Sequence, residues 1–267
     1  MMFGLNRKVA IVTGGYGALG TGMCRGLAEA GASVVVIGRD SKKAATLATE
    51  LGGESMGIAA DVLDKDALEA AAGQIMARYG RIDVLVNAAG GNSPEATAVP
   101  GQRTFFDLPQ EALQWVFNLN LIGTILPSQV FGKHMVNAGS GTILNISSMT
   151  SIQPLTRVVA YGNAKAAVNN FTQWLAVYMA TEHSPDIRVN AIAPGFFVGE
   201  QNYYLLYDQE DNLTPRGQQI IDHTPMGRFG DPEDLLGTVL WLVSDASKFV
   251  TGIVVPVDGG FSAYSGV

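Results

Sequence analysis

Residues 9–20 read VAIVTGGYGALG, in which an apolar run of strand length ends in a turn with four glycines and leads into a helical segment. Glycines in such a turn let the backbone approach a pyrophosphate, and the N-terminus of the following helix faces its negative charge. Tight turn geometry alone also uses glycines, but the place between the first strand and the first helix favours nucleotide binding. We therefore expect dinucleotide contacts at Gly14, Gly15, Tyr16, Gly17, Ala18, Leu19 and Gly20.

Apolar runs and helix-length segments alternate along the rest of the chain. The runs are apolar almost throughout, as expected of parallel strands that are covered on both faces. The predicted strands are Val9–Thr13, Val34–Ile37, Gly57–Ala60, Val84–Asn87, Thr142–Ile146, Ile187–Ile192 and Gly252–Val257. The predicted helices are Gly20–Gly31, Ser41–Leu51, Asp64–Tyr79, Pro109–Ala138, Ala160–Glu182 and Asp231–Ser244. This alternation predicts one α/β domain over residues 1–267, a Rossmann-type doubly wound parallel sheet with helices on both faces.

Two long segments interrupt the alternation, at residues 91–108 and 196–224. They follow the fourth and the sixth predicted strands. In open α/β sheets, ligands bind beyond the carboxyl ends of the strands, so both segments are expected to border a substrate. Variable surface loops are the alternative, although loops of this length in a compact domain are more often functional.

Composition excludes several classes of protein. The 267 residues carry a net charge of -7 and no basic run, which argues against a nucleic-acid partner. No apolar stretch approaches the roughly 18 residues of a membrane span, and the N-terminus shows no signal peptide, so we expect a cytoplasmic protein. The single cysteine, Cys24, fits a reducing compartment. His134, His183 and His223 lack metal-ligand spacing, so no metal site is expected.

A tyrosine, a lysine and a serine form a candidate active site. Tyr161 and Lys165 are four residues apart and are therefore neighbours on one helical face. A phenol has a pKa near 10, and a nearby ammonium favours its ionised form. Ser148 lies at the end of a predicted strand, where its hydroxyl can bond a carbonyl or alkoxide oxygen. Because hydride transfer to a ketone leaves negative charge on oxygen, a hydrogen-bond donor and a proton source are the groups required there.

These residues, together with Asn87-Ala88-Ala89-Gly90 and Tyr161-Gly162-Asn163-Ala164-Lys165, closely resemble the short-chain dehydrogenase/reductase family over essentially the whole chain. The resemblance implies that Tyr161 is the general acid and base. Lys165 then lowers its pKa and holds the nicotinamide ribose, and Ser148 orients the carbonyl. Asn120 matches the asparagine that binds a water in the proton relay. The sequence departs from the family at Ala18, where the usual glycine turn TGxxxGxG has its second fixed glycine.

The resemblance also implies further cofactor contacts, besides those of Tyr161 and Lys165, at Arg39, Asp61, Val62, Asn87, Ala88, Gly90, Pro194, Gly195 and Phe197. For Asp61, capping of the next helix is nearly as good an interpretation.

Cofactor preference depends on the end of the second strand. The family's acidic NAD-binding position falls on Gly38, and Arg39 follows it, which slightly favours NADP(H) over NAD(H). Against this, Asp40 could turn toward the ribose and Arg39 could stack on the adenine. Ser41 is predicted to be the N-cap of the next helix.

Several further blocks are more particular than the family pattern, among them Ala89–Thr97, Leu119–Pro127, Asn169–Val177 and the tail Pro256–Val267. Over these blocks the chain closely resembles one subgroup of the family, the D-mannonate oxidoreductases, or fructuronate reductases. This resemblance implies a sugar-acid substrate, D-fructuronate or D-mannonate. Because a uronate is anionic and rich in hydroxyls, we expect it to contact arginines and polar side chains. The candidates are Asn92, Ser148, Arg157, Gln201, Asn202 and Arg228.

Two alternatives remain open for the function. One is another polyol or ketogluconate dehydrogenase, such as a gluconate 5-dehydrogenase. The other is a non-catalytic nucleotide-sensing protein of the same fold, although such a protein has no chemical need for Asn120, Ser148, Tyr161 and Lys165 together. Relatives in the family assemble as tetramers, so a homotetramer is expected.

Overall fold

Seven parallel strands form one sheet at the centre of the computed structural model, which describes residues 2–199 and 203–266. The order is β3-β2-β1-β4-β5-β6-β7. The strands are β1 (Val9–Thr13), β2 (Ser33–Gly38), β3 (Met56–Ala59), β4 (Val84–Asn87), β5 (Gly141–Ile146), β6 (Ile187–Pro194) and β7 (Val254–Val257). Each predicted strand is present, and the predicted Rossmann-type fold is confirmed.

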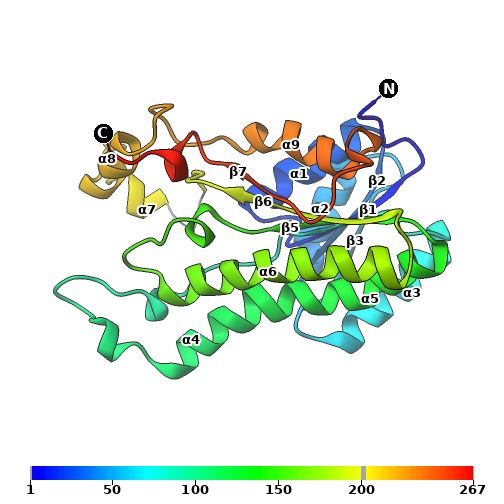
Figure 1. The fold of residues 1–267 in the computed structure, drawn as a ribbon, viewed down its shortest axis with the longest axis horizontal. Helices are drawn as coiled ribbons and strands as arrows, with labels where there is room; N and C mark the ends of the chain where they lie inside the picture. The colour runs from blue at the N-terminus through cyan, green and yellow to red at the C-terminus, as the bar shows by residue number, and fades with distance from the viewer. Residues whose placement is uncertain (1, 200–202, 267) are drawn as a thin grey trace.

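Helices cover both faces of the sheet (Figure 1). One face packs against α1 (Ala18–Glu29), α2 (Ser41–Leu51) and α9 (Leu236–Val243), and the other against α3 (Lys65–Tyr79), α5 (Gly123–Ala138) and α6 (Val159–Glu182). Side chains of a strand alternate between the two cores. Val34 and Val36 belong to the first, whereas Val35 and Ile37 belong to the second. This two-sided burial explains why the strands are apolar throughout. Within the described residues, no helix is long and apolar enough to cross a membrane.

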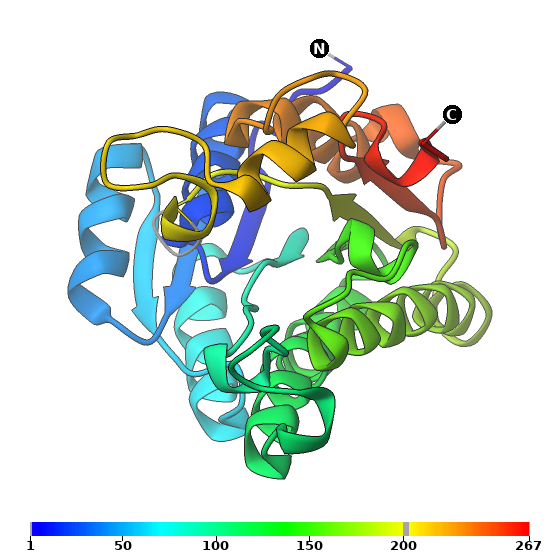
Figure 2. The same cartoon turned by 90° about the vertical axis from the view of Figure 1, so that its left-hand side faces the viewer.

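The strand order reverses direction between β1 and β4, and this switch point forms a crevice at the carboxyl ends of the strands. The two inserted segments lie at the same end. Figure 2 shows the segment 91–108 below the strand ends and the segment 203–222 above them. Both segments could therefore cover a ligand that binds at the carboxyl ends of the strands.

Some predictions of secondary structure differ from the structure. The predicted helix Pro109–Ala138 consists of α4 (Gln110–Phe117), a π-helical turn (Asn118–Ile122) and α5. The second insertion is not a simple loop, because it contains α7 (Tyr203–Leu206) and α8 (Pro215–Asp222). The predicted N-cap Ser41 is wrong, since the carboxylate of Asp40 accepts from the N–H groups of Lys42 and Lys43.

Candidate active site

The glycine-rich turn brings three backbone segments into direct contact. Gly14 has φ +63°, and a Cβ there would lie 2.8 Å from the Cα of Ala89 in the segment after β4. A Cβ on Gly20 would lie 2.2 Å from the carbonyl oxygen of Gly14. Ala18, the departure from the family pattern, is exposed at the first position of α1. Its methyl group therefore lies outside these close contacts.

The N-terminus of α1 is suited to a phosphate. Its N-cap, Gly17, has no side chain to cap the helix, and the first turn contains no acidic residue. The first N–H groups of the helix can therefore donate to an anionic ligand, and the helix dipole favours that charge. The cradle and the bare helix end together fit a pyrophosphate.

We predict that Gly20→Ala abolishes cofactor binding or weakens it strongly, and destabilises the fold by about 1–3 kcal/mol, because the added methyl meets backbone. Gly73→Ala is the matched control. A Cβ on Gly73 meets no atom within 4 Å, and the residue is exposed within α3. This control is expected to raise stability by about 0.5–1 kcal/mol. Thermal unfolding and a fluorescence titration with NADPH and NADH measure both effects, and equal behaviour of the two variants would contradict the cradle.

The end of β2 is covered by the aromatic ring of Tyr16. A Cβ on Gly38 would lie 2.3 Å from Cε1 of Tyr16, and the Tyr16 hydroxyl accepts from the Asp40 N–H at 2.8 Å. A side chain at this position, where the family pattern has an acid, would therefore require the Tyr16 ring to move. One oxygen of Asp40 is occupied by capping α2. Arg39 is exposed, and no ion pair to it is found within residues 2–199 and 203–266.

The segments after β3 and β4 supply further predicted cofactor residues. A carboxylate oxygen of Asp61 accepts from the Leu63 N–H at 2.9 Å, whereas the cap of α3 is Asp64. Val62 is buried and approaches Gly123 of α5. The alternative interpretation of Asp61, as the cap of the next helix, is therefore wrong, because Asp64 caps α3.

Asn87, the last residue of β4, forms hydrogen bonds with β5 and α5. Its side-chain amide donates to Ser128 Oγ at 3.0 Å and to Asn145 Oδ1 at 2.9 Å. The amide oxygen of Asn87 is buried and has no partner among the described residues. Ala88, the next residue, approaches the Gly14 backbone. These contacts join β4 to β5 and to the glycine-rich turn.

Asn120 and Lys165 converge on the segment that follows β4. The Lys165 Nζ donates to the Ile146 carbonyl at 2.8 Å, and the side chain is only 3% exposed. A Cβ on Gly90 would lie 2.8 Å from the Asn120 Oδ1 and 3.1 Å from the Lys165 Nζ. A larger residue at position 90 would force one or both of these side chains to shift.

The π-helical turn between α4 and α5 explains the position of Asn120. Its side-chain amide donates to the carbonyls of Val116 and Gly91, at 2.8 and 2.7 Å, and its Oδ1 accepts from the Gly91 N–H at 3.1 Å. The side chain is fully buried. Asn120 thus fixes the start of the first insertion relative to the helix.

Ser148 and Tyr161 face each other across the end of β5. Burial raises the pKa of Tyr161 above its usual value of 10, and an interaction with the Ser148 hydroxyl acts against this rise. Burial lowers the pKa of Lys165 to about 8, and its Nζ lies 5.6 Å from the centre of the Tyr161 ring. The neighbouring Ser147 bonds Asn169 and Ser151 and so has a structural role. The hydroxyl groups of Ser148 and Tyr161 therefore lie close enough to interact.

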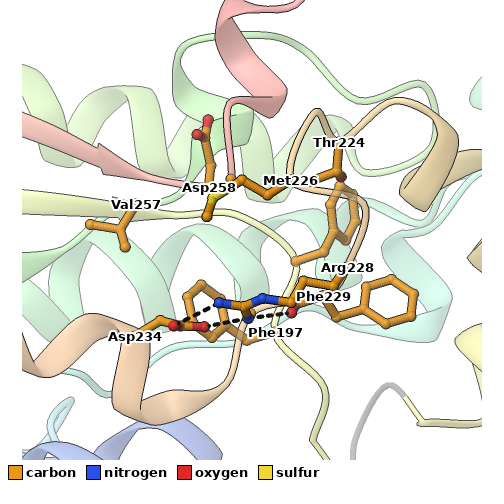
Figure 3. A pocket seen from close by; sticks show the side chains of 11 residues that line it. Phe197, Thr224, Met226, Arg228, Phe229, Asp234, Val257 and Asp258 are labelled. Carbon is orange, nitrogen blue, oxygen red and sulfur yellow. Dashed lines mark hydrogen bonds and ion pairs between the residues drawn. The ribbon is translucent and has the colours of Figure 1, made fainter.

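The predicted contacts after β6 lie beside a cavity of about 220 Å³ (Figure 3). Phe197 and Arg228 line it, and a Cβ on Gly195, which follows Pro194, would lie 2.6 Å from the Cα of Asp258. The Arg228 guanidinium makes two hydrogen bonds to the Asp234 carboxylate, at 2.6 and 2.9 Å. Arg228 therefore already has an anionic partner within the chain.

The remaining substrate candidates are placed differently. Asn92 is exposed and donates to Thr97 Oγ1 at 2.9 Å. Arg157 is partly buried and lies just before α6, four residues before Tyr161. Gln201 and Asn202 lie outside the described residues.

Sequence reasoning did not single out Thr150 and Gln153, which closely follow Ser148 in the chain, or Arg216 at the start of α8. Thr214 and Pro215 are the sequence signals that could have revealed this helix, since they match an N-cap and a first helical position.

Comparison with known proteins shows the family of the chain. A family model described as enoyl-(acyl carrier protein) reductase matches residues 16–262. A crystal structure with bound NAD, of a candidate D-mannonate oxidoreductase from Haemophilus influenzae, is 44% identical; it covers 99% of this chain and 98% of its own, with a TM-score of 0.92. The 2-dehydro-3-deoxy-D-gluconate 5-dehydrogenase of Escherichia coli (strain K12) is 36% identical over 98% of both chains. A gluconate 5-dehydrogenase from Burkholderia cenocepacia, crystallised with NADP and tartrate, is 32% identical over 98% of both chains, with a TM-score of 0.88.

The fold and the similar proteins together define the class of this enzyme. It is an NAD(P)-dependent oxidoreductase that acts on alcohol groups. The chain belongs to the short-chain dehydrogenase/reductase family.

Proposed function

We propose that this enzyme interconverts the ketone and alcohol forms of a sugar acid, D-fructuronate and D-mannonate, with a nicotinamide cofactor. The convergence of Ser148, Tyr161, Lys165 and Asn120 at one end of the sheet carries the proposal. The similarity to a candidate D-mannonate oxidoreductase supports this substrate. The names of two other similar proteins, a gluconate 5-dehydrogenase and a 2-dehydro-3-deoxy-D-gluconate 5-dehydrogenase, also refer to six-carbon sugar acids.

Each side chain of the site has a distinct task in ketone reduction. When bound, the nicotinamide supplies the hydride. Ser148 donates a hydrogen bond to the carbonyl oxygen, where negative charge develops. Tyr161 donates its phenolic proton to the same oxygen, and in alcohol oxidation its phenolate accepts that proton. Lys165 places positive charge near the phenol, and Asn120 holds the Gly91 backbone in position.

A coupled absorbance assay at 340 nm tests the substrate. The panel contains D-fructuronate, D-mannonate, D-gluconate, 5-keto-D-gluconate and the neutral D-mannitol, each with both cofactors. We expect the highest kcat/KM for D-fructuronate or D-mannonate. A higher value for gluconate or ketogluconate would favour the alternative ketogluconate dehydrogenase. Tight cofactor binding without turnover of any member would favour a nucleotide-sensing protein.

We further propose that the enzyme prefers NADP(H). Relatives bind either cofactor: NAD is present in one similar structure and NADP in another. The preference for this chain rests on Gly38, which has no acidic side chain to bind the ribose hydroxyls, and on Arg39, which has no ion-pair partner within the described residues. Lys42 is a second cation close in sequence. A basic side chain at this place can bind a 2′-phosphate.

Arg39→Ala is expected to lower kcat/KM for NADPH about 10- to 100-fold, the cost of one charge-assisted bond to phosphate, and to change the value for NADH less than about threefold. Initial rates with each cofactor measure the effect. Arg25→Ala, which removes an exposed arginine paired with Glu50, is the control. A wild-type enzyme that strongly prefers NADH would contradict the assignment.

We also propose a cytoplasmic homotetramer. On α6, Trp174 and Val177 are 57% and 64% exposed, and the Trp174 ring stacks on Tyr178. Large apolar side chains exposed together on one helix are typical of a subunit interface. Light scattering after size exclusion measures the assembly, and Trp174→Glu is expected to reduce its mass.

A further inference from the structure

Three polar side chains connect the chain around Ser148 with the helix α6. The Asn169 amide donates to the Ser151 hydroxyl at 2.8 Å. The Ser148 carbonyl in turn accepts from the Ser151 hydroxyl at 2.5 Å and from the Ser151 N–H at 2.9 Å. Ser147, directly before Ser148, donates from its hydroxyl to the Asn169 Oδ1 at 2.5 Å. The two ends of the Asn169 side chain thus bind residues on both sides of Ser148.

The helix face that carries Asn169 also carries Tyr161 and Lys165. The three residues are spaced by four, so their side chains follow one another along one face of α6. The Lys165 Nζ donates to the Ile146 carbonyl at 2.8 Å, and the Ser147 hydroxyl lies 3.3 Å from the Lys165 carbonyl oxygen. This face of α6 is therefore bonded to the end of β5 and to the residue that follows it.

The turn Met149–Ser151 packs closely on α6 as well. A Cβ on Gly162 of α6 would lie 3.0 Å from the Thr150 hydroxyl oxygen. Met149 is buried in a cluster that also contains residues of α7 and α8. The turn is thus in direct contact with α6 and with the second insertion, and the bonds from Asn169 connect it to the helix at a defined place.

The backbone of Ser148 decides where its hydroxyl lies. The residue is extended, with φ -164° and ψ 152°, and its Oγ accepts from the Thr150 N–H at 3.4 Å. A serine hydroxyl has two lone pairs and one proton, so this bond leaves the proton available for an oxygen of a ligand. The same hydroxyl interacts with that of Tyr161. A rotation of the Ser148 backbone would change the distance between the two hydroxyl groups.

We propose that Asn169 is a positioning residue: through Ser147 and Ser151 it holds Ser148 at the place where the hydroxyls of Ser148 and Tyr161 reach one substrate oxygen. Asn169 does not touch the substrate and acts only through Ser148. This role rests on the proposed function, in which Ser148 and Tyr161 serve ketone reduction, and it does not depend on which sugar acid is the substrate.

Steady-state kinetics with the fastest substrate of the panel test this role. Asn169→Ala is expected to lower kcat about 10- to 30-fold, less than the roughly 10²-fold loss that a displacement of 1 Å can cause. Ser151→Ala breaks the same connection at its other end and should lower kcat by a similar factor. The matched control is Asn170→Ala, which changes the next asparagine of α6. Because Asn170 is exposed, its replacement should change kcat less than about twofold.

A double-mutant cycle separates positioning from a general disturbance of the fold. In a Ser148→Ala background, Asn169→Ala should lower kcat less than about twofold, because the hydroxyl that Asn169 positions is already absent. A further loss of about tenfold or more in that background would overturn the positioning role, since independent effects multiply. Unchanged kcat in both Asn169→Ala and Ser151→Ala would overturn it as well.

Crystal structures of the wild type, Asn169→Ala and Ser151→Ala test the same role without turnover. We expect the Ser148 Oγ to move by about 0.5–1 Å relative to the Tyr161 oxygen in both variants, a displacement large enough to slow the reaction. An unmoved Ser148 would contradict the positioning role even if kcat falls. If Ser148 moves but no member of the substrate panel is turned over, Asn169 holds the serine and the proposed function fails.

Discussion

Replacing Tyr161 by phenylalanine is expected to lower kcat about 10³-fold in both directions, because a positioned proton donor contributes on the order of 10²–10⁴. The substitution removes only the hydroxyl. The ring keeps its packing against the cluster of Ala96, Val116 and Ala160. Cofactor affinity should therefore change less than about twofold. Steady-state rates and a fluorescence titration with NADPH measure the two quantities.

The pH dependence gives a second readout of the same residue. Burial raises the pKa of Tyr161, so the phenolate fraction grows with pH throughout the neutral range. In the wild-type enzyme, kcat/KM should rise with pH for alcohol oxidation and should not rise for ketone reduction. Tyr161→Phe should lose this rise. Tyr79→Phe, which removes the hydroxyl that donates to the Glu54 carbonyl, is the control. Unchanged turnover of Tyr161→Phe would exclude the tyrosine as the proton donor.

The sheet could be predicted from sequence because its signal is local. Residues of β1, β2 and β4 are buried on both faces, so each strand appears as an uninterrupted apolar run with a clear end. The crevice followed from one further rule, that ligands lie at the carboxyl ends of such strands. The glycine turn was recognisable for the same reason, since its four glycines lie within residues 14–20, directly after the first strand.

The site was less predictable where a residue depends on contacts that are distant in sequence. Asn120 was named from the family resemblance, but the π-helical turn that carries it was not predicted. The Asn120 side chain bonds Gly91, which is distant in sequence, and no glycine or proline within residues 110–122 marks the turn. The interpretation of Ser41 as a cap failed because Asp40 competed for the same N–H groups.

Lys165→Met is expected to abolish turnover while stabilising the cofactor-free protein at pH 7. In the unfolded chain the lysine has its ordinary pKa of 10.5, whereas burial lowers the pKa to about 8 in the folded protein. This lowering corresponds to a cost of roughly 3 kcal/mol for holding the charge inside. Methionine has similar length and no charge. The lost bond from Nζ to the Ile146 carbonyl offsets roughly 1 kcal/mol or more, so we expect a net gain of about 1–2 kcal/mol.

The gain should depend on pH in a direction that follows from proton binding. Below pH 8, Lys165 is protonated in both states, and the wild-type protein bears the whole cost of burial. Between pH 8 and 10.5 the unfolded state binds more protons, so the free energy of unfolding of the wild type rises with pH. The advantage of Lys165→Met should therefore shrink between pH 7 and pH 10.

Urea unfolding at several pH values measures the free energy of unfolding of both proteins. The control is Lys133→Met, which replaces an exposed lysine of α5. A variant less stable than wild type at pH 7 would show that the fold stabilises this charge. A gain confined to low pH would mean that the enzyme keeps a destabilising ammonium because its chemistry requires one beside Tyr161.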